Sequence, residues 1–310
     1  MLFAVNPGDN TVSAFTIDKH NPTNITMLGA PTDSLGEFPV AVAYSRKHKT
    51  ACVVNSGGEA NIACFSVSKT GLVPIANTTQ SLGLNQTNPP TGPANTVSDI
   101  IFNQEESQLL VSVKGTPNGT AGFIANFPVT SGSPFAFSQT PVKSTPQNGA
   151  LPFSMTLVGH HGDTVFSTDA GFGVSVSKFD LNTGAILNSS SVAIANQTAT
   201  CWSTYSPRTG SFFVTDVGRN VMSEFRVNSA IPLTKEVGFY TLSGSGGRID
   251  LNVASLPGND FLYVLDPKDS AVSVVKLRGI GNGVQIQQFD AQAAVPDLPV
   301  SIQGMAVFVN

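Results

Sequence analysis

Short hydrophobic runs alternate with polar turns along the whole chain, and one arrangement of them occurs six times. In each copy a hydrophobic run ends at a polar residue, a turn rich in Gly, Pro or Asn follows, and a second hydrophobic run comes next. Successive polar residues are 49, 59, 55, 47 and 50 residues apart, and counting from the last one past the chain end to the first gives another 50. We call them the anchor residues: Asn6, Asn55, Lys114, Asp169, Asp216 and Asp266.

Fixed periods of this length that hold several short strands are typical of β-propellers. Each repeat predicts an inner strand, a polar hairpin turn, the anchor strand, a third strand and a weaker outer strand. The expected inner strands are residues 39–44, 97–102, 151–158, 199–205 and 249–254, and examples of outer strands are residues 25–30, 237–242 and 284–289. The sequence therefore predicts an all-β fold, a six-bladed β-propeller that forms a single domain over residues 1–310.

The two ends of the chain are expected to complete the sixth blade together. Residues 300–307 form a last inner strand without downstream partners, and residues 3–5 lack an upstream one. Pairing the N- and C-terminal strands closes the propeller and removes exposed strand edges. Two long segments rich in Pro, Gly and Ser, residues 77–94 and 130–150, are expected to form a cover over one face.

Composition narrows the classes of partner. The 310 residues include 12% charged residues, the net charge is −4, and there is no basic run, so nucleic acid is not an expected partner. No stretch approaches 18 consecutive apolar residues, so no membrane-spanning helix is expected. The oligomeric state is left open.

Cysteines and glycosylation sequons favour the secretory route. Cys52 and Cys64 flank a tight turn, and the sequence leaves open whether they form a disulfide or remain two buried thiols. Cys201 is expected to be a buried free thiol. Asn-x-Ser/Thr sequons occur at Asn24, Asn77, Asn85, Asn118, Asn188 and Asn196. We expect a secreted glycoprotein whose signal peptide precedes this sequence.

Candidate chemistry gathers at the channel mouth that carries the anchor residues, since ligand sites of such folds lie at mouths. Asp and Asn anchors have two interpretations, because they either cap their own turns or contact a ligand. Lys114 has no capping role, so it is expected to form an ion pair or to donate to a carbonyl or enolate oxygen. Its positive charge argues against a catalytic metal. The candidate catalytic residues are Lys114, Arg248 and Asp216. The candidate substrate-binding residues are Phe38, Asn55, Thr96, Asp99, Phe153, Asp169, Thr200, Trp202 and Asp266.

Histidines are expected to lie away from this mouth. His48, His160 and His161 fall in the predicted hairpin turns of the opposite face, and His20 lies in a loop near an outer strand. The usual residue for triad or general-base catalysis is therefore not expected at the mouth. No Gly-rich phosphate loop leads from a strand into a helix, and no cofactor is expected.

Residues 2–17, 36–45, 93–103, 164–173 and 199–220 resemble a family of fungal secreted propellers described as lactonase-like or 3-carboxymuconate-cyclase-like. Some members resemble hetero-Diels–Alderases that join a tropolone-derived quinone methide to a humulene-type terpene. The resemblance implies a cofactor-free cyclase of fungal secondary metabolism that positions a small hydrophobic substrate for cycloaddition. The alternatives are a lactone hydrolase or lactonizing enzyme, and a non-catalytic secreted surface protein or adhesin.

Overall fold

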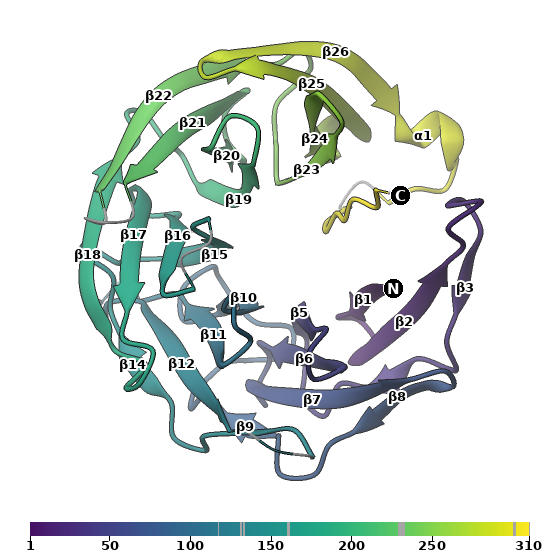
Figure 1. The fold of residues 1–310 in the computed structure, drawn as a ribbon, viewed down its shortest axis with the longest axis vertical. Helices are drawn as coiled ribbons and strands as arrows, with labels where there is room; N and C mark the ends of the chain where they lie inside the picture. Colours follow the sequence, from purple (N-terminus) through teal and green to yellow (C-terminus); the bar gives the residue numbers. More distant parts are fainter. Residues whose placement is uncertain are drawn as a thin grey trace. The chain divides into compact units, whose positions relative to one another are not determined.

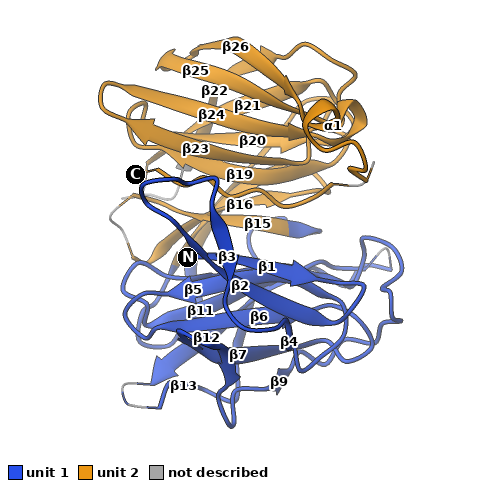
Figure 2. Cartoon of the chain, turned by 90° about the vertical axis from the view of Figure 1, so that its right-hand side faces the viewer, with its two compact units in different colours: residues 1–152, 179–187 blue, residues 153–178, 188–310 orange. Residues whose placement is uncertain are grey.

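The structure is a computed structural model of residues 1–310. It describes all of them except Pro117, Ser131, Ser133, His160, His161, Ser229, Ala230, Ile231, Pro232, Val300, Ser301 and Asn310. The predictions for His160 and His161, and the first two residues of the strand expected over residues 300–307, therefore lie outside the described residues. The chain divides into two compact units, shown in different colours in Figure 2. Unit 1 comprises Met1–Pro152 and Phe179–Leu187, and unit 2 comprises Phe153–Lys178 and Asn188–Asn310.

Six antiparallel sheets, which we call blades 1 to 6, follow one another in chain order (Figure 1). Blades 1 to 3 belong to unit 1. Blade 1 contains β1 (Leu2–Asn6), β2 (Thr11–Ile17), β3 (Ile25–Met27) and β4 (Thr32–Asp33). Blade 2 contains β5 (Pro39–Ser45), β6 (Thr50–Asn55), β7 (Asn61–Ser68), β8 (Gly71–Pro74) and β9 (Gln80–Ser81). Blade 3 contains β10 (Val97–Phe102), β11 (Gln108–Val113), β12 (Phe123–Thr130), β13 (Ala136–Phe137) and β14 (Val142–Ser144).

Blades 5 and 6 and most of blade 4 belong to unit 2. Blade 4 contains β15 (Pro152–Leu157), β16 (Thr164–Asp169), β17 (Gly173–Phe179) and β18 (Ile186–Ala193). Blade 5 contains β19 (Thr200–Ser206), β20 (Ser211–Asp216), β21 (Val221–Asn228) and β22 (Leu233–Thr241). Blade 6 contains β23 (Asp250–Leu256), β24 (Asn259–Asp266), β25 (Ala271–Gly279) and β26 (Asn282–Asp290).

These six sheets confirm the predicted fold class, a six-bladed β-propeller. Helical structure in the described part of the chain is limited to a 3-10 turn, η1 (Pro267–Asp269), and one turn of α-helix, α1 (Ala291–Ala294). Neither of these helices has the length or the apolar character needed to cross a membrane. The single domain expected from the sequence stays a prediction.

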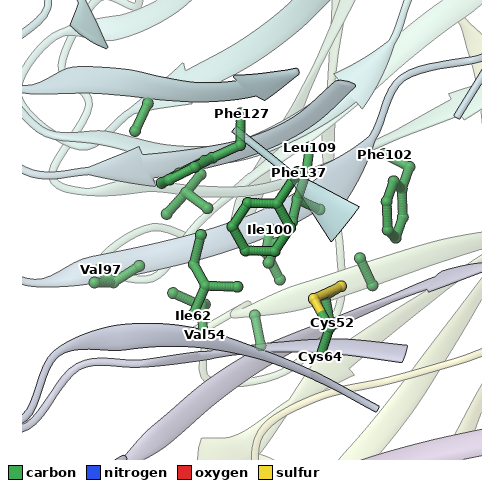
Figure 3. Packing of buried hydrophobic residues seen from close by; sticks show 14 of the residues in the cluster. Cys52, Val54, Ile62, Cys64, Val97, Ile100, Phe102, Leu109, Phe127 and Phe137 are labelled. Atoms are coloured by element: carbon green, nitrogen blue, oxygen red, sulfur yellow. A yellow bond between two sulfur atoms is a disulfide. The ribbon is translucent and has the colours of Figure 1, made fainter. Parts of the chain in front are cut away.

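Hydrophobic side chains fill the space between consecutive blades of each unit. In unit 1 the core between blades 2 and 3 buries Val54 and Ile62 against Ile100 and Phe127, as Figure 3 shows. In unit 2 Phe166 of blade 4 stacks on Phe212 of blade 5, with ring centroids 4.6 Å apart. Because each strand presents alternate residues to the two neighbouring blades, the hydrophobic runs of the sequence become these cores.

A disulfide lies inside the unit 1 core (Figure 3). Cys52 of β6 and Cys64 of β7 are directly paired across the two strands, with Cα atoms 4.0 Å apart, and both side chains are fully buried. Cys201 is a buried free thiol. The sequence left the disulfide open, because the register that places two cysteines opposite each other is a property of the sheet.

The C-terminal strand expected over residues 300–307 is not formed in its described part. Residues 302–309 have no strand assignment, and Gly304 has a φ of 80°, a left-handed conformation that interrupts an extended strand. β1 pairs with β2. Closure by pairing of the chain ends therefore stays a prediction.

The two long segments expected to cover one face are partly built into the blades. Residues 77–94 contribute β9, which pairs with β7, and residues 130–150 contribute β13 and β14, which pair with β12. Phe135 and Phe137 are buried in the core between blades 2 and 3. The parts that pair extend their blades, and residues 82–94 and 145–150 have no strand assignment.

Candidate functional site

Five of the six anchor residues end the strand that the sequence assigned to them. Asn6, Asn55, Asp169, Asp216 and Asp266 are the last residues of β1, β6, β16, β20 and β24. Lys114 differs, because β11 ends at Val113, and Val113 pairs with Val97 as Asn55 pairs with Pro39. Lys114 thus lies one residue beyond the anchor position.

Asp169 and Asp216 cap their own turns. Asp169 Oδ1 accepts a hydrogen bond from the Gly171 N–H at 2.8 Å. Asp216 Oδ1 accepts from the Gly218 N–H at 3.0 Å and the Ala199 N–H at 3.1 Å, and its Oδ2 accepts from the Thr198 N–H at 2.7 Å. Both oxygens of Asp216, predicted as catalytic, are therefore committed to backbone donors, which is the capping interpretation of the anchors.

The two Asn anchors are also held within their blades. Asn55 Nδ2 donates to the Ser34 carbonyl at 3.1 Å and to Asn61 Oδ1 at 2.8 Å. Asn6 Nδ2 donates to the hydroxyls of Thr11 and Ser13 at 2.9 and 3.1 Å. These amides join the chain before and after the anchor turn, which is a structural role.

Arg248 and Asp266 form a fully buried ion pair in unit 2. The Arg248 Nε atom lies 3.1 Å from Asp266 Oδ1, and both side chains have no exposed surface. Arg248 Nη2 donates to the Ser243 carbonyl at 2.5 Å, and Ser273 Oγ donates to Asp266 Oδ2 at 2.6 Å. Arg248 was predicted to donate to a substrate at the mouth, but this pair holds it inside blade 6.

Burial dominates the protonation of this pair. Desolvation raises the pKa of Asp266 to about 6, although the Ser273 hydroxyl and the Arg248 guanidinium act in the opposite direction. Desolvation also lowers the pKa of Arg248, against the attraction of Asp266 and Asp269. An ion pair without solvent contact fixes the connection between the loop around Ser243 and the end of β24, and it offers no accessible charge to a ligand.

Near the start of the inner strand, three blades share the same kind of hydrogen bond from the backbone to a side chain. One inner-strand N–H in each donates to a hydroxyl of the neighbouring strand: Asp99 to Ser112 at 3.1 Å, Ser154 to Thr168 at 2.9 Å and Trp202 to Thr215 at 3.2 Å. The register shifts at this point in blades 3 and 5. At these positions the pairing of the two strands decides where the side chains lie as much as the local sequence does.

The predicted substrate-binding residues at the inner-strand starts are held by contacts within their own units. Phe153 and Trp202 make an edge-to-face contact with centroids 5.3 Å apart in unit 2. Thr200 donates to Gln197 Oε1 at 3.0 Å, and Asp99 Oδ1 accepts from the Ile100 N–H at 2.8 Å. Phe38 has a left-handed φ of 55°, and its N–H donates to Asn10 Oδ1 at 2.8 Å.

The sequence places Asp250 at an inner-strand start near the channel, but it is not among the candidate catalytic or substrate-binding residues. It opens β23, is 7% exposed, and accepts hydrogen bonds from the N–H groups of Leu251 and Met305. Burial raises its pKa to about 6 in spite of those two donors. Asp99 and Asp250 occupy equivalent positions near the start of an inner strand, and each accepts a hydrogen bond from the N–H of the next residue.

A cavity of about 670 Å³ lies in unit 1, at the end of blade 3 where β11 runs into β12. Three segments line it, near residues 93–94, 116–121 and 145–151. Its volume falls in the range of small-molecule sites. The described lining residues are neutral: Pro93, Ala94, Thr116, Gly119, Thr120, Ala121, Thr145, Asn148, Gly149, Ala150 and Leu151.

Two of the predicted residues lie directly behind the cavity wall. Lys114 is 6% exposed, and its Nζ donates to Thr96 Oγ1 at 3.1 Å. The Thr96 hydroxyl in turn donates to the Pro93 carbonyl at 2.6 Å, and Pro93 lines the cavity. The sequence analysis named Lys114 and Thr96, which lie behind this wall, but it did not name the small residues that form the wall, since Ala, Gly and Thr carry no distinctive signal.

In the part of the chain that the structure describes, no three His, Cys, Asp or Glu side chains gather as a metal site requires. The asparagines of the six sequons are all exposed. Asn118 precedes Gly119 and Thr120 of the cavity lining.

The sequence matches no protein-family model and no curated protein. Solved structures are similar in fold. A putative 6-phosphogluconolactonase from Bacteroides uniformis has a TM-score of 0.71 and 15% identity, over 93% of this chain and 81% of the other. The periplasmic gluconolactonase PpgL of Pseudomonas aeruginosa has a TM-score of 0.64 and 16% identity, over 90% and 77%. The β-propeller domain of Cps50 (Swd1) from Myceliophteria thermophila has a TM-score of 0.53 and 9% identity, over 93% and 85%. At these identities the likeness shows the fold of the chain and does not assign a reaction.

Proposed function

We propose that this protein is a cofactor-free cyclase that binds a small hydrophobic substrate in the unit 1 cavity and promotes a hetero-Diels–Alder-type cycloaddition. The observation that carries the proposal is the chemistry of the cavity wall, which is apolar apart from neutral hydroxyl and amide groups. A wall of this kind favours a neutral organic molecule. Its apolar surface contacts the molecule, and its few polar groups fix the orientation of that molecule.

Cycloaddition suits such a wall because the reaction forms its bonds in one concerted step and transfers no proton. What accelerates it is the alignment of the two reacting partners, and holding partners in a near-attack geometry supplies a large part of many enzymatic rate enhancements. The hydroxyl groups of Thr116 and Thr120 and the side-chain amide of Asn148 are the polar groups with which the cavity orients a substrate carbonyl.

Lys114 acts in this proposal from behind the wall. Its ammonium group is hydrogen-bonded to the Thr96 hydroxyl and directs the hydroxyl proton toward the Pro93 carbonyl. Through these hydrogen bonds Lys114 holds the Thr96 hydroxyl and the Pro93 segment of the cavity wall in place, and so helps to keep the two bound partners aligned. Lys114 is therefore a positioning residue.

The test compares the reaction of a tropolone-derived quinone methide and a humulene-type terpene with and without the protein. We expect a faster reaction and one predominant stereoisomer, measured by chiral chromatography of the adduct. Lys114→Met is expected to slow the reaction while Lys69→Met, a change at an exposed lysine of blade 2, leaves it unchanged. If the adduct forms at the uncatalysed rate and without stereoselectivity in the presence of the protein, the proposed cyclase activity is wrong.

Lactone hydrolysis is the second candidate, and the similarity in fold to gluconolactonase-type propellers favours it. In this reaction water adds to the lactone carbonyl, the ring C–O bond breaks, and one proton is released with the carboxylate at neutral pH. A pH-stat assay on δ-lactones measures that proton directly. If the protein releases acid from δ-lactones and has no effect on the cycloaddition, the protein is a lactonase and the cyclase proposal is wrong.

We place the protein in the secretory route, where disulfides persist and sequons are glycosylated. The Cys52–Cys64 disulfide and the six exposed sequon asparagines support this location. To test this, the protein is expressed through a eukaryotic secretory pathway, and its mass is measured before and after glycosidase treatment. An unchanged mass would contradict the prediction that the sequons are glycosylated.

A further inference from the structure

Three alanines from three separate segments meet in the lining of the unit 1 cavity. Ala94 precedes β10, Ala121 belongs to the loop between β11 and β12, and Ala150 precedes β15. Leu151 is the largest of the described lining side chains. The open volume therefore exists because short side chains stand where three loops come together.

Hydrogen bonds and close packing fix these loops to one another. The Gly115 N–H donates to the Ala150 carbonyl at 2.8 Å, the Asn95 N–H donates to the Gly115 carbonyl at 2.9 Å, and the Gln86 amide donates to the Ala94 carbonyl at 3.1 Å. A Cβ atom on Gly115 would lie 2.3 Å from the Thr120 carbonyl oxygen, and one on Gly122 would lie 2.2 Å from the Pro152 ring. A wall packed this closely does not widen easily around a larger ligand.

From this geometry we infer that Ala94, Ala121 and Ala150 determine the size of the molecule that the cavity accepts, and that the cavity selects neutral molecules over phosphorylated ones of the same skeleton. This inference rests on the proposed function, because it assumes that the cavity is the substrate site. It names the substrate class more narrowly as neutral, weakly polar ring systems.

Selection against phosphate follows from the lining. Proteins bind phosphate groups with Arg or Lys side chains or with the N–H groups at a helix N-terminus. The described lining residues include no cationic side chain, and the lining segments are loops. A phosphate in this cavity loses hydration without gaining a charged partner.

The size inference is tested with two neutral fluorescent probes, 1-naphthol with two fused rings and Nile red with four. Ala121→Phe and Ala150→Phe each add a phenyl ring at an exposed position of the lining, and Ala76→Phe adds one at an exposed turn after β8 that does not line the cavity. We expect both lining variants to weaken Nile red binding by about tenfold or more, because the added ring occupies volume that the larger probe needs. The 1-naphthol affinity should change much less, and Ala76→Phe should change neither.

Two results are decisive. If the unmodified protein binds neither neutral probe, the cavity is not a site for neutral molecules and the proposed function itself fails. If the protein binds Nile red and both lining variants bind it equally well while melting at the same temperature, the alanines do not set ligand size and only this inference fails. Two variants are used so that a folding defect in one leaves the other to decide.

The charge inference has its own pair of probes. 1-Naphthol and 1-naphthyl phosphate share a skeleton and differ in the phosphate group. We expect the phosphate ester to bind at least about tenfold more weakly, because it lacks a charged partner in the lining. Equal or tighter binding of the ester overturns the selection of neutral molecules.

Discussion

Asp250 gives the sharpest prediction about stability. Its carboxyl is 7% exposed, and burial raises its pKa from an ordinary value of 3.8 to about 6. Between these two values the native protein binds more protons at this site than the unfolded chain does. The free energy of unfolding therefore falls as the pH rises through this interval and is constant, for this group, above about pH 7.

The size of the effect follows from the shift. A difference of about two pKa units corresponds to roughly 3 kcal/mol at 1.36 kcal/mol per unit. Asp250→Asn removes the charge while keeping an oxygen that accepts hydrogen bonds from the Leu251 and Met305 N–H groups. We therefore expect the variant to be more stable than the parent at pH 8, by up to about 3 kcal/mol, and close to it at pH 4.

Urea unfolding followed by fluorescence of the single tryptophan, at pH values from 4 to 8, measures both proteins. Asp297→Asn, at an exposed carboxyl of the same unit, is the matched control and should leave the pH dependence of the parent unchanged. Parallel curves of stability against pH for the parent and Asp250→Asn would refute the argument, because they would show that the Asp250 pKa is the same in the folded and unfolded states.

Two further predictions concern the ion pair and the cysteines. Arg248→Met should destabilise the protein by about 3–5 kcal/mol, since it leaves Asp266 buried without its counter-ion, and adding Asp266→Asn should restore much of that loss in urea unfolding; a double variant as unstable as the single one would speak against the pair. Protein made under oxidising conditions and unfolded without reductant should take up one iodoacetamide group, on Cys201, whereas three groups would show that Cys52 and Cys64 are free thiols.

The repeat spacing and the strand pattern could be predicted from the sequence because both depend on short-range rules. A hydrophobic run of alternating burial becomes a strand, and an Asp or Asn followed by Gly becomes a turn, whatever the rest of the chain does. Asp169 and Asp216 illustrate this, since each ends a strand and accepts a hydrogen bond from a glycine N–H two residues later. The break at Gly304 illustrates the limit of the rule, because its left-handed φ interrupts a run that looks like a strand.

The site could be predicted only in part, because its chemistry depends on which residues distant in sequence come together. Lys114 was singled out by its unusual type, and the fold then placed it behind the cavity wall on Thr96. Arg248 was singled out for its positive charge, and the fold pairs it with Asp266 inside blade 6, which the sequence did not indicate.

Sequence by itself determined the number and order of the blades, because strand and turn formation are local and repeat with a fixed period. Tertiary structure alone decided the desolvation of Asp250 and the existence of the cavity. Desolvation depends on every group that excludes water from a carboxyl, and a cavity is the space that three loops leave open. Ala94, Ala121 and Ala150 carry no signal in the sequence, and they matter through the volume that they do not fill.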